Sequence, residues 1–228
     1  MTTNIDKIKL KAVVFDLDGT LLNTIDTIDY YLNLSLGRHG LPTVSKAETM
    51  SFVGDGAVKL IERAMDRVGA DRSLFDLIYR FYNEAYNSDP YHLTKVYDGI
   101  AELICRLRES GISLAVLSNK PDFAVKAAVD HFFPDSFDVV LGGRESVCLK
   151  PAPDAIHEIV EKLGISIDEI AYVGDSEVDV LTAENAGIHN AYFVSWGFRT
   201  AEQLAAAGAT RILNSASDLL NILKTDVI

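Results

Sequence analysis

Cysteine is scarce in this sequence, which contains only Cys105 and Cys148. The two residues stand 43 positions apart, form no CxxC pair and have no histidine partner at zinc-finger spacing. A disulfide framework and a structural zinc site are therefore not indicated. We expect both side chains to be small, buried, hydrophobic groups in a reducing compartment.

Long apolar runs and basic stretches are also missing. The apolar run that follows Lys11 stops at Asp16, which is too early for a signal peptide or a membrane span, so we expect a cytoplasmic protein with no membrane partner. The 228 residues include 33 Asp and Glu against 21 Lys and Arg, a net charge of −12, and no lysine- or arginine-rich stretch offsets this excess. The charge balance argues against a nucleic-acid partner.

Three common motifs of phosphate and ester chemistry are absent as well. Neither cysteine has an arginine six positions later, where Gly111 and Asp154 stand, so there is no cysteine-phosphatase loop. The patterns GxxxxGKS/T and GxSxG do not occur either. P-loop NTPases and hydrolases with the usual nucleophile elbow are thereby excluded.

The sequence does contain short apolar, β-branched runs that alternate with helical patterns. Several helical patterns stop at a glycine that suits the left-handed position after a helix end, as at Gly164 and Gly187. This alternation predicts an α/β fold with a doubly wound, mostly parallel sheet. The expected strands are 11–17, 113–117, 137–141, 170–173, 191–194 and 210–213, and the expected helices are 99–110, 121–131, 153–163 and 177–186.

One segment breaks the alternation. From about Thr24 to Asp89 the apolar spacing is helical throughout, and this segment stands between the first strand and the rest of the sheet. It is therefore predicted to be an inserted, all-helical lid. The domain boundaries that follow are a discontinuous α/β core of residues 1–22 and 91–228, with the lid at 23–90.

Polar residues follow the strand-like runs at the end where parallel sheets bind ligands. The carboxyl ends of parallel strands lie along one edge, so these residues should converge on one rim. They are Asp16, Asp18, Thr20, Ser118, Asn119, Lys120, Lys150, Gly174, Asp175, Ser176 and Asp179.

The carboxylates of this set indicate a binding site for a cation. Asp16 and Asp18 are two apart on an extended backbone and share a face, and Asp175 arrives from another strand end. Carboxylates gathered at one rim raise one another's pKa unless a positive charge lies among them, and Mg²⁺ suits such oxygen ligands best. Lys150 adds a fixed positive charge, which suits a phosphoryl group.

Simpler interpretations of the same residues remain open. Asp-Gly after a strand is commonly a turn, and Ser118 with Asn119 has the composition of a helix N-cap. Lys150 before a proline is most often a solvated loop residue, and Asp175 with Ser176 is also a plausible cap. Against these alternatives, all four groups stand at strand ends on the edge where this fold class places its chemistry.

Four ordered segments resemble the motifs of the haloacid dehalogenase superfamily of phosphohydrolases. The resemblance spans nearly the whole sheet region, and the helical insertion resembles the family's cap of the first type; we call residues 23–90 the cap. Two further segments, "FVGDGAVKLIERAM" (52–65) and "WGFRT" (196–200), are similar to phosphoglycolate phosphatases. The four motifs are "DLDGTLL" (16–22), "LSNK" (117–120), "KPAPD" (150–154) and "YVGDSEVDVLTAENAG" (172–187).

The resemblance implies a role for each matching residue. Asp16 would attack phosphorus and become an aspartyl phosphate, and Asp18 would be the general acid and then the general base. Ser118 and Lys150 would neutralise the phosphoryl oxygens. Further contacts to the substrate phosphate are expected from Thr20 and Asn119.

The resemblance also implies a Mg²⁺ site. Its ligands would be the side chain of Asp16, the main-chain carbonyl of Asp18 and the side chain of Asp175. Gly174 and Asp179 would lie behind these ligands, with Asp179 orienting Lys150 or a metal-bound water.

Substrate choice is expected to reside in the cap. Gly54 and Gly56 could present main-chain donors to a small carboxylate, with Lys59 one turn on, although a plain turn between helices explains them equally well. The aromatic residues Tyr79, Phe81, Tyr82 and Tyr86 are expected to form cap core rather than a substrate pocket.

One pair of residues departs from the usual pattern of phosphoglycolate phosphatases. These enzymes show Asp-Ser after the first motif, where this chain has Asn23 and Thr24. Either pair can cap the first cap helix, so the substrate is in question rather than the reaction.

The favoured hypothesis is a Mg²⁺-dependent phosphatase that acts on a small phosphorylated metabolite, with 2-phosphoglycolate as the first candidate. A sugar phosphomutase on the same scaffold is an alternative. A non-enzymatic receiver module that stores a phosphoryl group on aspartate is a second alternative. The chain is expected to be a monomer or a homodimer.

Overall fold

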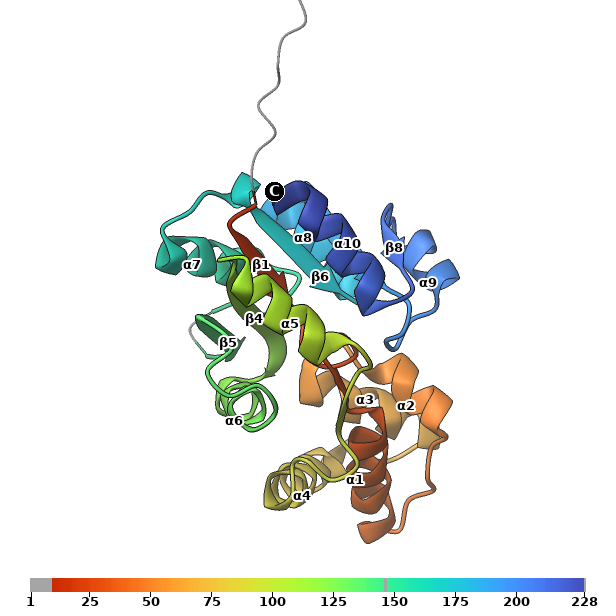
Figure 1. The fold of residues 1–228 in the computed structure, drawn as a ribbon. Coiled ribbons are helices and arrows are strands. Elements are labelled where there is room, and N and C mark those ends of the chain that lie inside the picture. The colour runs from red at the N-terminus through yellow and green to blue at the C-terminus, as the bar shows by residue number, and fades with distance from the viewer. Residues whose placement is uncertain (1–9, 146, 228) are drawn as a thin grey trace, which may run out of the picture.

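A computed structural model describes residues 10–145 and 147–227 of the chain (Figure 1). These residues form a six-stranded sheet in the order β5-β4-β1-β6-β7-β8, and every neighbouring pair is parallel. This confirms the predicted doubly wound sheet. The strands are β1 (Ala12–Phe15), β4 (Ser113–Pro121), β5 (Val139–Gly143), β6 (Ile170–Gly174), β7 (Asn190–Val194) and β8 (Ile212–Leu213).

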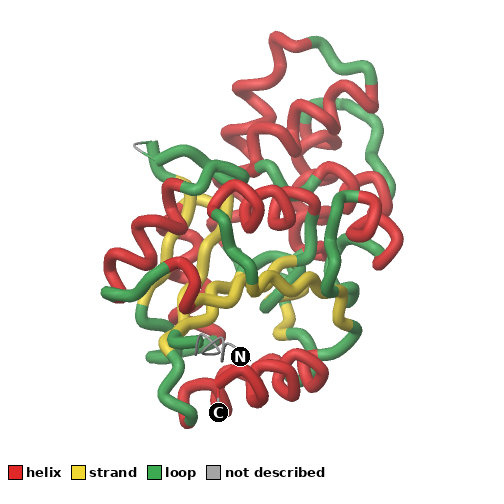
Figure 2. Tube along the Cα trace, turned by 90° about the horizontal axis from the view of Figure 1, so that it is seen from above, coloured by secondary structure: helices red, strands yellow, loops and turns green. Residues whose placement is uncertain are grey.

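Helices cover both faces of this sheet, as Figure 2 shows with helices in red around strands in yellow. Helices α5, α6 and α10 pack on one face, and α7, α8 and α9 pack on the other. The four expected helical ranges differ from the observed ones by at most one residue at each end. The helices are α5 (Ile100–Glu109), α6 (Asp122–Phe132), α7 (Asp154–Leu163), α8 (Glu177–Ala186), α9 (Ala201–Ala206) and α10 (Ala216–Val227).

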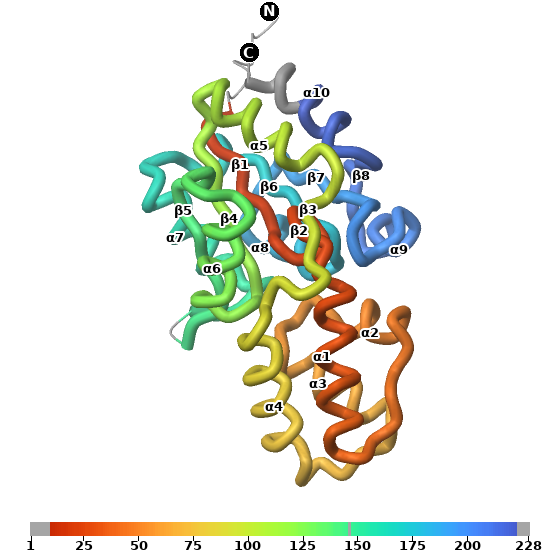
Figure 3. Tube along the Cα trace, turned by 60° about the horizontal axis from the view of Figure 1, so that its bottom comes forward, coloured from red at the N-terminus to blue at the C-terminus, as the bar shows by residue number. Residues whose placement is uncertain are grey.

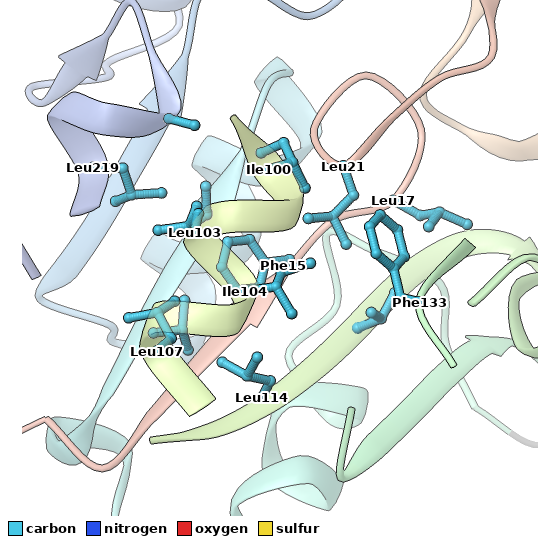
Figure 4. Close-up of a cluster of buried hydrophobic side chains, with 14 of the residues drawn as sticks. Phe15, Leu17, Leu21, Ile100, Leu103, Ile104, Leu107, Leu114, Phe133 and Leu219 are labelled. Carbon is cyan, nitrogen blue, oxygen red and sulfur yellow. The ribbon is translucent and has the colours of Figure 1, made fainter. Parts of the chain in front are cut away.

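The central strand β1 is buried on both faces because its side chains alternate between two apolar clusters. Val13 and Phe15 face α5, whereas Ala12 and Val14 face α7 and α8. Figure 4 shows Phe15 against Ile104 of α5 in the first of these clusters. Full burial of a valine or phenylalanine side chain stabilises the fold by about 1.5–3 kcal/mol. This packing fixes the position of β1 and therefore of the residues that follow it.

The cap helices form a separate bundle with its own apolar cluster. A short antiparallel ribbon of β2 (Leu22–Asn23) and β3 (Lys95–Val96) lies between this bundle and the sheet (Figure 3). The domain boundaries remain a prediction, and residues 1–9, 146 and 228 of the predicted core lie outside the described residues. The cap helices are α1 (Ile25–Arg38), α2 (Lys46–Phe52), α3 (Gly56–Val68) and α4 (Phe75–Ser88). A 3-10 turn at Arg72–Leu74 precedes α4, and another at Ile167–Glu169 precedes β6 in the core.

Three expectations about local structure are wrong. Cys105 and Cys148 are exposed free thiols rather than buried side chains. Ser118 and Asn119 do not cap a helix, because β4 continues in extended conformation through Pro121. Thr24 makes no capping hydrogen bond to α1, since its Oγ1 and the Oδ1 of Asn23 are buried without a partner in the described part of the chain.

Within the described residues no helix is long and apolar enough to cross a membrane.

Candidate active site

The predicted rim residues lie around one cavity of about 100 Å³ between the sheet edge and the cap. β1 leads into Asp16, whose backbone N–H donates to the Val173 carbonyl of β6 at 2.8 Å and so continues the sheet ladder. The strand extension of β4 carries Ser118 to the same edge. The cavity is lined by ten of the residues singled out in the sequence, namely Asp16, Asp18, Gly54, Gly56, Ser118, Asn119, Lys120, Lys150, Asp175 and Ser176.

Lys150 links two carboxylates beneath the cavity. Its Nζ lies 2.8 Å from Asp16 Oδ1 and 2.8 Å from Asp179 Oδ1, and 6% of the residue is exposed. Burial alone would lower the pKa of this lysine, but the charges of Asp16 and Asp179 raise it well above its ordinary value. Lys150 is therefore a fixed cation in the site and not a solvated loop residue.

Asp179 is engaged on both carboxylate oxygens. Oδ1 accepts from Lys150 and from the Tyr172 hydroxyl at 2.7 Å, and Oδ2 accepts from the backbone N–H of Asp175 and Ser176. Ser176 is the N-cap of α8 and forms a capping box with Asp179, so the cap interpretation of this segment is correct. Burial would raise the pKa of Asp179, but Lys150 lowers it overall.

Asp175 is held by neighbours that the sequence motifs only partly indicated. Its Oδ1 accepts from Thr20 Oγ1 at 3.1 Å, and its Oδ2 accepts from the backbone N–H of Phe198 at 2.7 Å. Thr20 is fully buried against Asp175 and is not among the residues that line the cavity. The structure thus places Thr20 behind a candidate metal ligand rather than against substrate. Phe198 was not predicted to take part.

Three buried carboxylates come together where the metal site was predicted. Asp16, Asp175 and Asp179 each offer an oxygen, and these oxygens lie within 4.8 Å of one another. Burial raises the pKa of Asp16 to about 7, against the opposing charge of Lys150. Burial and the neighbouring charges of Asp179 and Asp16 also raise the pKa of Asp175 well above its ordinary value.

These raised pKa values show that negative charge is costly at this position without a cation. Asp16 and Asp175 fit a hard divalent ion, which takes oxygen ligands. Asp179 already has hydrogen-bond donors on both oxygens, so it is suited to orienting its neighbours rather than to binding the ion. The carboxylate of Asp18 points elsewhere and accepts from Lys120 Nζ at 3.3 Å.

The cap contributes directly to the cavity wall. Asn119 Nδ2 donates to the Gly54 carbonyl at 3.1 Å and to the Lys150 carbonyl at 3.0 Å, which joins the cap loop to the core. Tyr82 and Tyr86 pack in the cap core, as expected, and they also line the cavity. Lys59 is exposed, pairs with Glu62 at 2.7 Å and is not among the residues that line the cavity.

Arg199 makes a further connection from the core to the cap. It donates to the carbonyls of Met50 at 2.7 Å and Val53 at 2.8 Å, and it forms an ion pair with Glu177 of α8 at 2.7 Å. Only the segment "WGFRT" hinted at this residue, since nothing local in the sequence identifies a partner 146 or more positions away.

Comparison with known proteins fits this geometry. The model of the haloacid dehalogenase-like hydrolase family matches residues 13–193. The chain belongs to this family. It is an enzyme of the phosphatase type, and the alternative of a non-enzymatic receiver module is set aside.

Individual relatives are similar along almost their whole length. A phosphoglycolate phosphatase of Chromobacterium violaceum is 33% identical over 219 residues, which cover 94% of this chain and 97% of that protein. One of Vibrio parahaemolyticus is 30% identical over 221 residues, covering 94% and 96%. A crystal structure of a predicted phosphoglycolate phosphatase from Haemophilus somnus superposes with a TM-score of 0.87 at 28% identity, covering 93% of this chain and 97% of that one.

Proposed function

We propose that this chain is a Mg²⁺-dependent phosphatase that hydrolyses a small phosphorylated metabolite through an aspartyl phosphate, with 2-phosphoglycolate as the first candidate substrate. The observation that carries the proposal is the buried Asp16 at the cavity wall, 2.8 Å from Lys150 and grouped with Asp175. A carboxylate held this way can attack phosphorus while a cation neutralises the phosphoryl oxygens.

The residues divide the reaction into two displacements. In the first, an Asp16 oxygen forms a bond to phosphorus, the bond from phosphorus to the ester oxygen breaks, and Asp18 gives its proton to the leaving alcohol. In the second, Asp18 takes a proton from water, the water oxygen bonds to phosphorus, and the bond from phosphorus to Asp16 breaks. Inorganic phosphate and the free Asp16 carboxylate result.

Other groups hold the phosphoryl oxygens and the cation. Ser118 and Lys150 line the cavity beside Asp16 and supply donors to the phosphoryl group. Asp16 and Asp175, with the Asp18 carbonyl, would hold Mg²⁺. The ion would supply positive charge against the phosphoryl oxygens and the buried carboxylates. Asp179 positions Lys150 through their 2.8 Å contact.

Cavity size and relatives support a small substrate. About 100 Å³ is well below the roughly 300–1,000 Å³ of pockets that take drug-sized ligands, which favours a metabolite of few atoms over the sugar bisphosphate of a phosphomutase. Relatives at about 30% identity are named phosphoglycolate phosphatases. A cytoplasmic location and the oligomeric state stay predictions.

The test is a screen of the purified chain against phosphorylated metabolites, with Mg²⁺ and with EDTA, in which released phosphate is measured. We expect hydrolysis of 2-phosphoglycolate in Mg²⁺ and a loss of at least about 100-fold in EDTA, because two buried carboxylates then lack their counter-charge. A sugar bisphosphate incubated in parallel should yield phosphate rather than an isomerised sugar phosphate. Activity that EDTA leaves intact would contradict the metal dependence, and hydrolysis of none of the metabolites would contradict the phosphatase assignment.

A further inference from the structure

Three cationic side chains line the cavity, and two of them are fully engaged by the protein. Lys150 is paired with Asp16 and Asp179. Arg199 donates to Glu177 and to two cap carbonyls. Lys120 is the third cation of this wall.

Lys120 has weaker partners than the other two cations. Its Nζ lies 3.3 Å and 3.4 Å from the two oxygens of Asp18, both longer than a usual charge-assisted hydrogen bond of about 2.7–2.9 Å. Its shortest contact is a 2.7 Å hydrogen bond to the hydroxyl of Tyr86, a neutral group of α4. The ammonium also lies 4.6 Å from the centre of the Tyr86 ring. An anion of better geometry could therefore displace Asp18 from Lys120.

The surroundings of Lys120 favour an anionic guest. The side chain is 12% exposed, and the cap side of the cavity is largely apolar, with Ile28, Val53, Leu60 and Tyr82 in its wall. An apolar wall does not compensate a buried carboxylate, so a cation has to. Tyr86 of α4 holds the lysine head at this place through its hydroxyl and its ring.

The spacing along β4 sets how far the anionic group stands from the phosphoryl group. The strand is bulged between Leu117 and Pro121, and both Ser118 and Lys120 line the cavity, where the Lys120 backbone N–H donates to Ser118 Oγ at 3.2 Å. Two residues of chain span at most about 7 Å. A substrate whose phosphoryl group lies against Ser118 reaches Lys120 with a group only one or two carbon atoms away.

We propose that Lys120, held by Tyr86, is the specificity residue of this site and binds a carboxylate carried one or two carbon atoms from the phosphoryl group. The inference rests on the proposed phosphatase function and names the residue that binds the part of the substrate away from the phosphoryl group. Binding of the carboxylate also releases Asp18 from Lys120, so Asp18 becomes available to the leaving oxygen when an acidic substrate is present. A neutral phosphate ester leaves Asp18 paired.

The experiment compares 2-phosphoglycolate with its neutral analogue, ethylene glycol monophosphate, in wild type and in Lys120→Met, Lys120→Arg and Lys126→Met. Lys126 is the matched control, because it is an exposed lysine of α6 that pairs with Asp122 and is not among the cavity residues. We expect wild type to have the higher kcat/KM on the acid. In Lys120→Met, kcat/KM should fall about 10- to 100-fold more on the acid than on the neutral ester, since one charge-assisted contact is lost. Lys120→Arg should restore most of the preference, and Lys126→Met should keep it whole.

Three results would overturn the inference while leaving the phosphatase function standing. The first is that wild type hydrolyses both esters equally well, a comparison that does not depend on the folding of any variant. Lys120→Met could lose the same factor on both esters, which would assign the lysine to the phosphoryl group or to Asp18. Lys120→Met could also keep the full preference for the acid. If wild type hydrolyses neither ester nor p-nitrophenyl phosphate, the proposed function itself fails.

Discussion

At the scale of one residue, Asp16 is a candidate nucleophile whose buried position makes its negative charge energetically unfavourable. Burial raises its pKa to about 7 from an ordinary value of 3.8. Between these two values the folded protein binds a proton that the unfolded chain has released, so this group makes the metal-free protein less stable as pH rises from about 4 to about 7. A bound cation would offset the free-energy cost of ionising the buried Asp16 carboxyl group.

The corresponding prediction concerns Asp16→Asn, which cannot titrate. In EDTA, the free energy of unfolding of the variant relative to wild type should increase from pH 5 to pH 8 by on the order of 1–4 kcal/mol. Turnover should fall by at least about 10⁴-fold at both pH values because the attacking oxygen is lost. Urea unfolding and phosphate release measure the two effects. If the free energy of unfolding of the two proteins changes with pH in the same way, burial of Asp16 does not destabilise the protein as its raised pKa implies.

At the scale of elements, the turn from β6 into α8 is built around the absence of a side chain at Gly174. A Cβ at this position would overlap the carboxyl group of Asp179, which positions Lys150 and accepts from the backbone of Asp175 and Ser176. Gly174 was predicted to lie behind the site, and this contact gives it a physical function there. The turn therefore has room for Asp179 in one position only.

Gly174→Ala should destabilise the protein by about 3 kcal/mol, because a methyl group has to displace a buried, fully hydrogen-bonded carboxylate. It should also lower kcat about 10-fold or more, since Lys150 loses its support. Gly37→Ala is the matched control: no atom lies within 4 Å of the added Cβ, so this helix substitution should stabilise by about 0.4–1 kcal/mol. Thermal unfolding and steady-state kinetics test both variants. Equal stability of the two would mean that Asp179 has another position available.

The elements also show what local sequence can and cannot indicate. Strand β1 was predictable because burial on both faces requires a continuous apolar run, and Asp16 was predictable because the run ends there. Within the predicted all-helical cap, no apolar spacing identified α2 as a separate helix, since only Thr49 of its seven residues is buried. Thr24 was expected to cap α1, but its backbone geometry leaves the hydroxyl unpaired. Propensity at a helix end does not specify this geometry.

At the scale of the whole molecule, the sequence indicated the rim of the sheet but not what the cap brings to it. Tyr86 carries an ordinary helical apolar spacing, and its contact with Lys120 depends on how α4 lies against β4. Arg199 likewise finds its carbonyl partners only after the cap loop has come to rest on the core. These contacts join residues 34 to 149 positions apart, and no single-sequence pattern reports them.

The cap and the core are nevertheless connected in a way that makes them separable. The chain leaves the core at Asn23 and returns at Lys95, and these two residues pair in the β2–β3 ribbon. The two apolar clusters on the faces of the sheet contain no residue between 24 and 90. A short turn that replaces residues 24–94 would close a small gap at little entropic cost and leave both clusters in place.

We therefore expect this shortened chain to fold and to retain Mg²⁺-dependent hydrolysis of p-nitrophenyl phosphate, with kcat/KM lower by at least about 100-fold because water enters the open site. Its preference for 2-phosphoglycolate over that aryl ester should disappear, since Tyr86 no longer holds Lys120 in place and Gly54 and Gly56 are gone. Trp196 provides the control for folding: its indole N–H donates to the Thr20 carbonyl at 3.1 Å, so native near-ultraviolet dichroism of this residue reports an intact core edge. A folded core that still prefers the metabolite would show that Lys120 selects the substrate without Tyr86 and the cap loop.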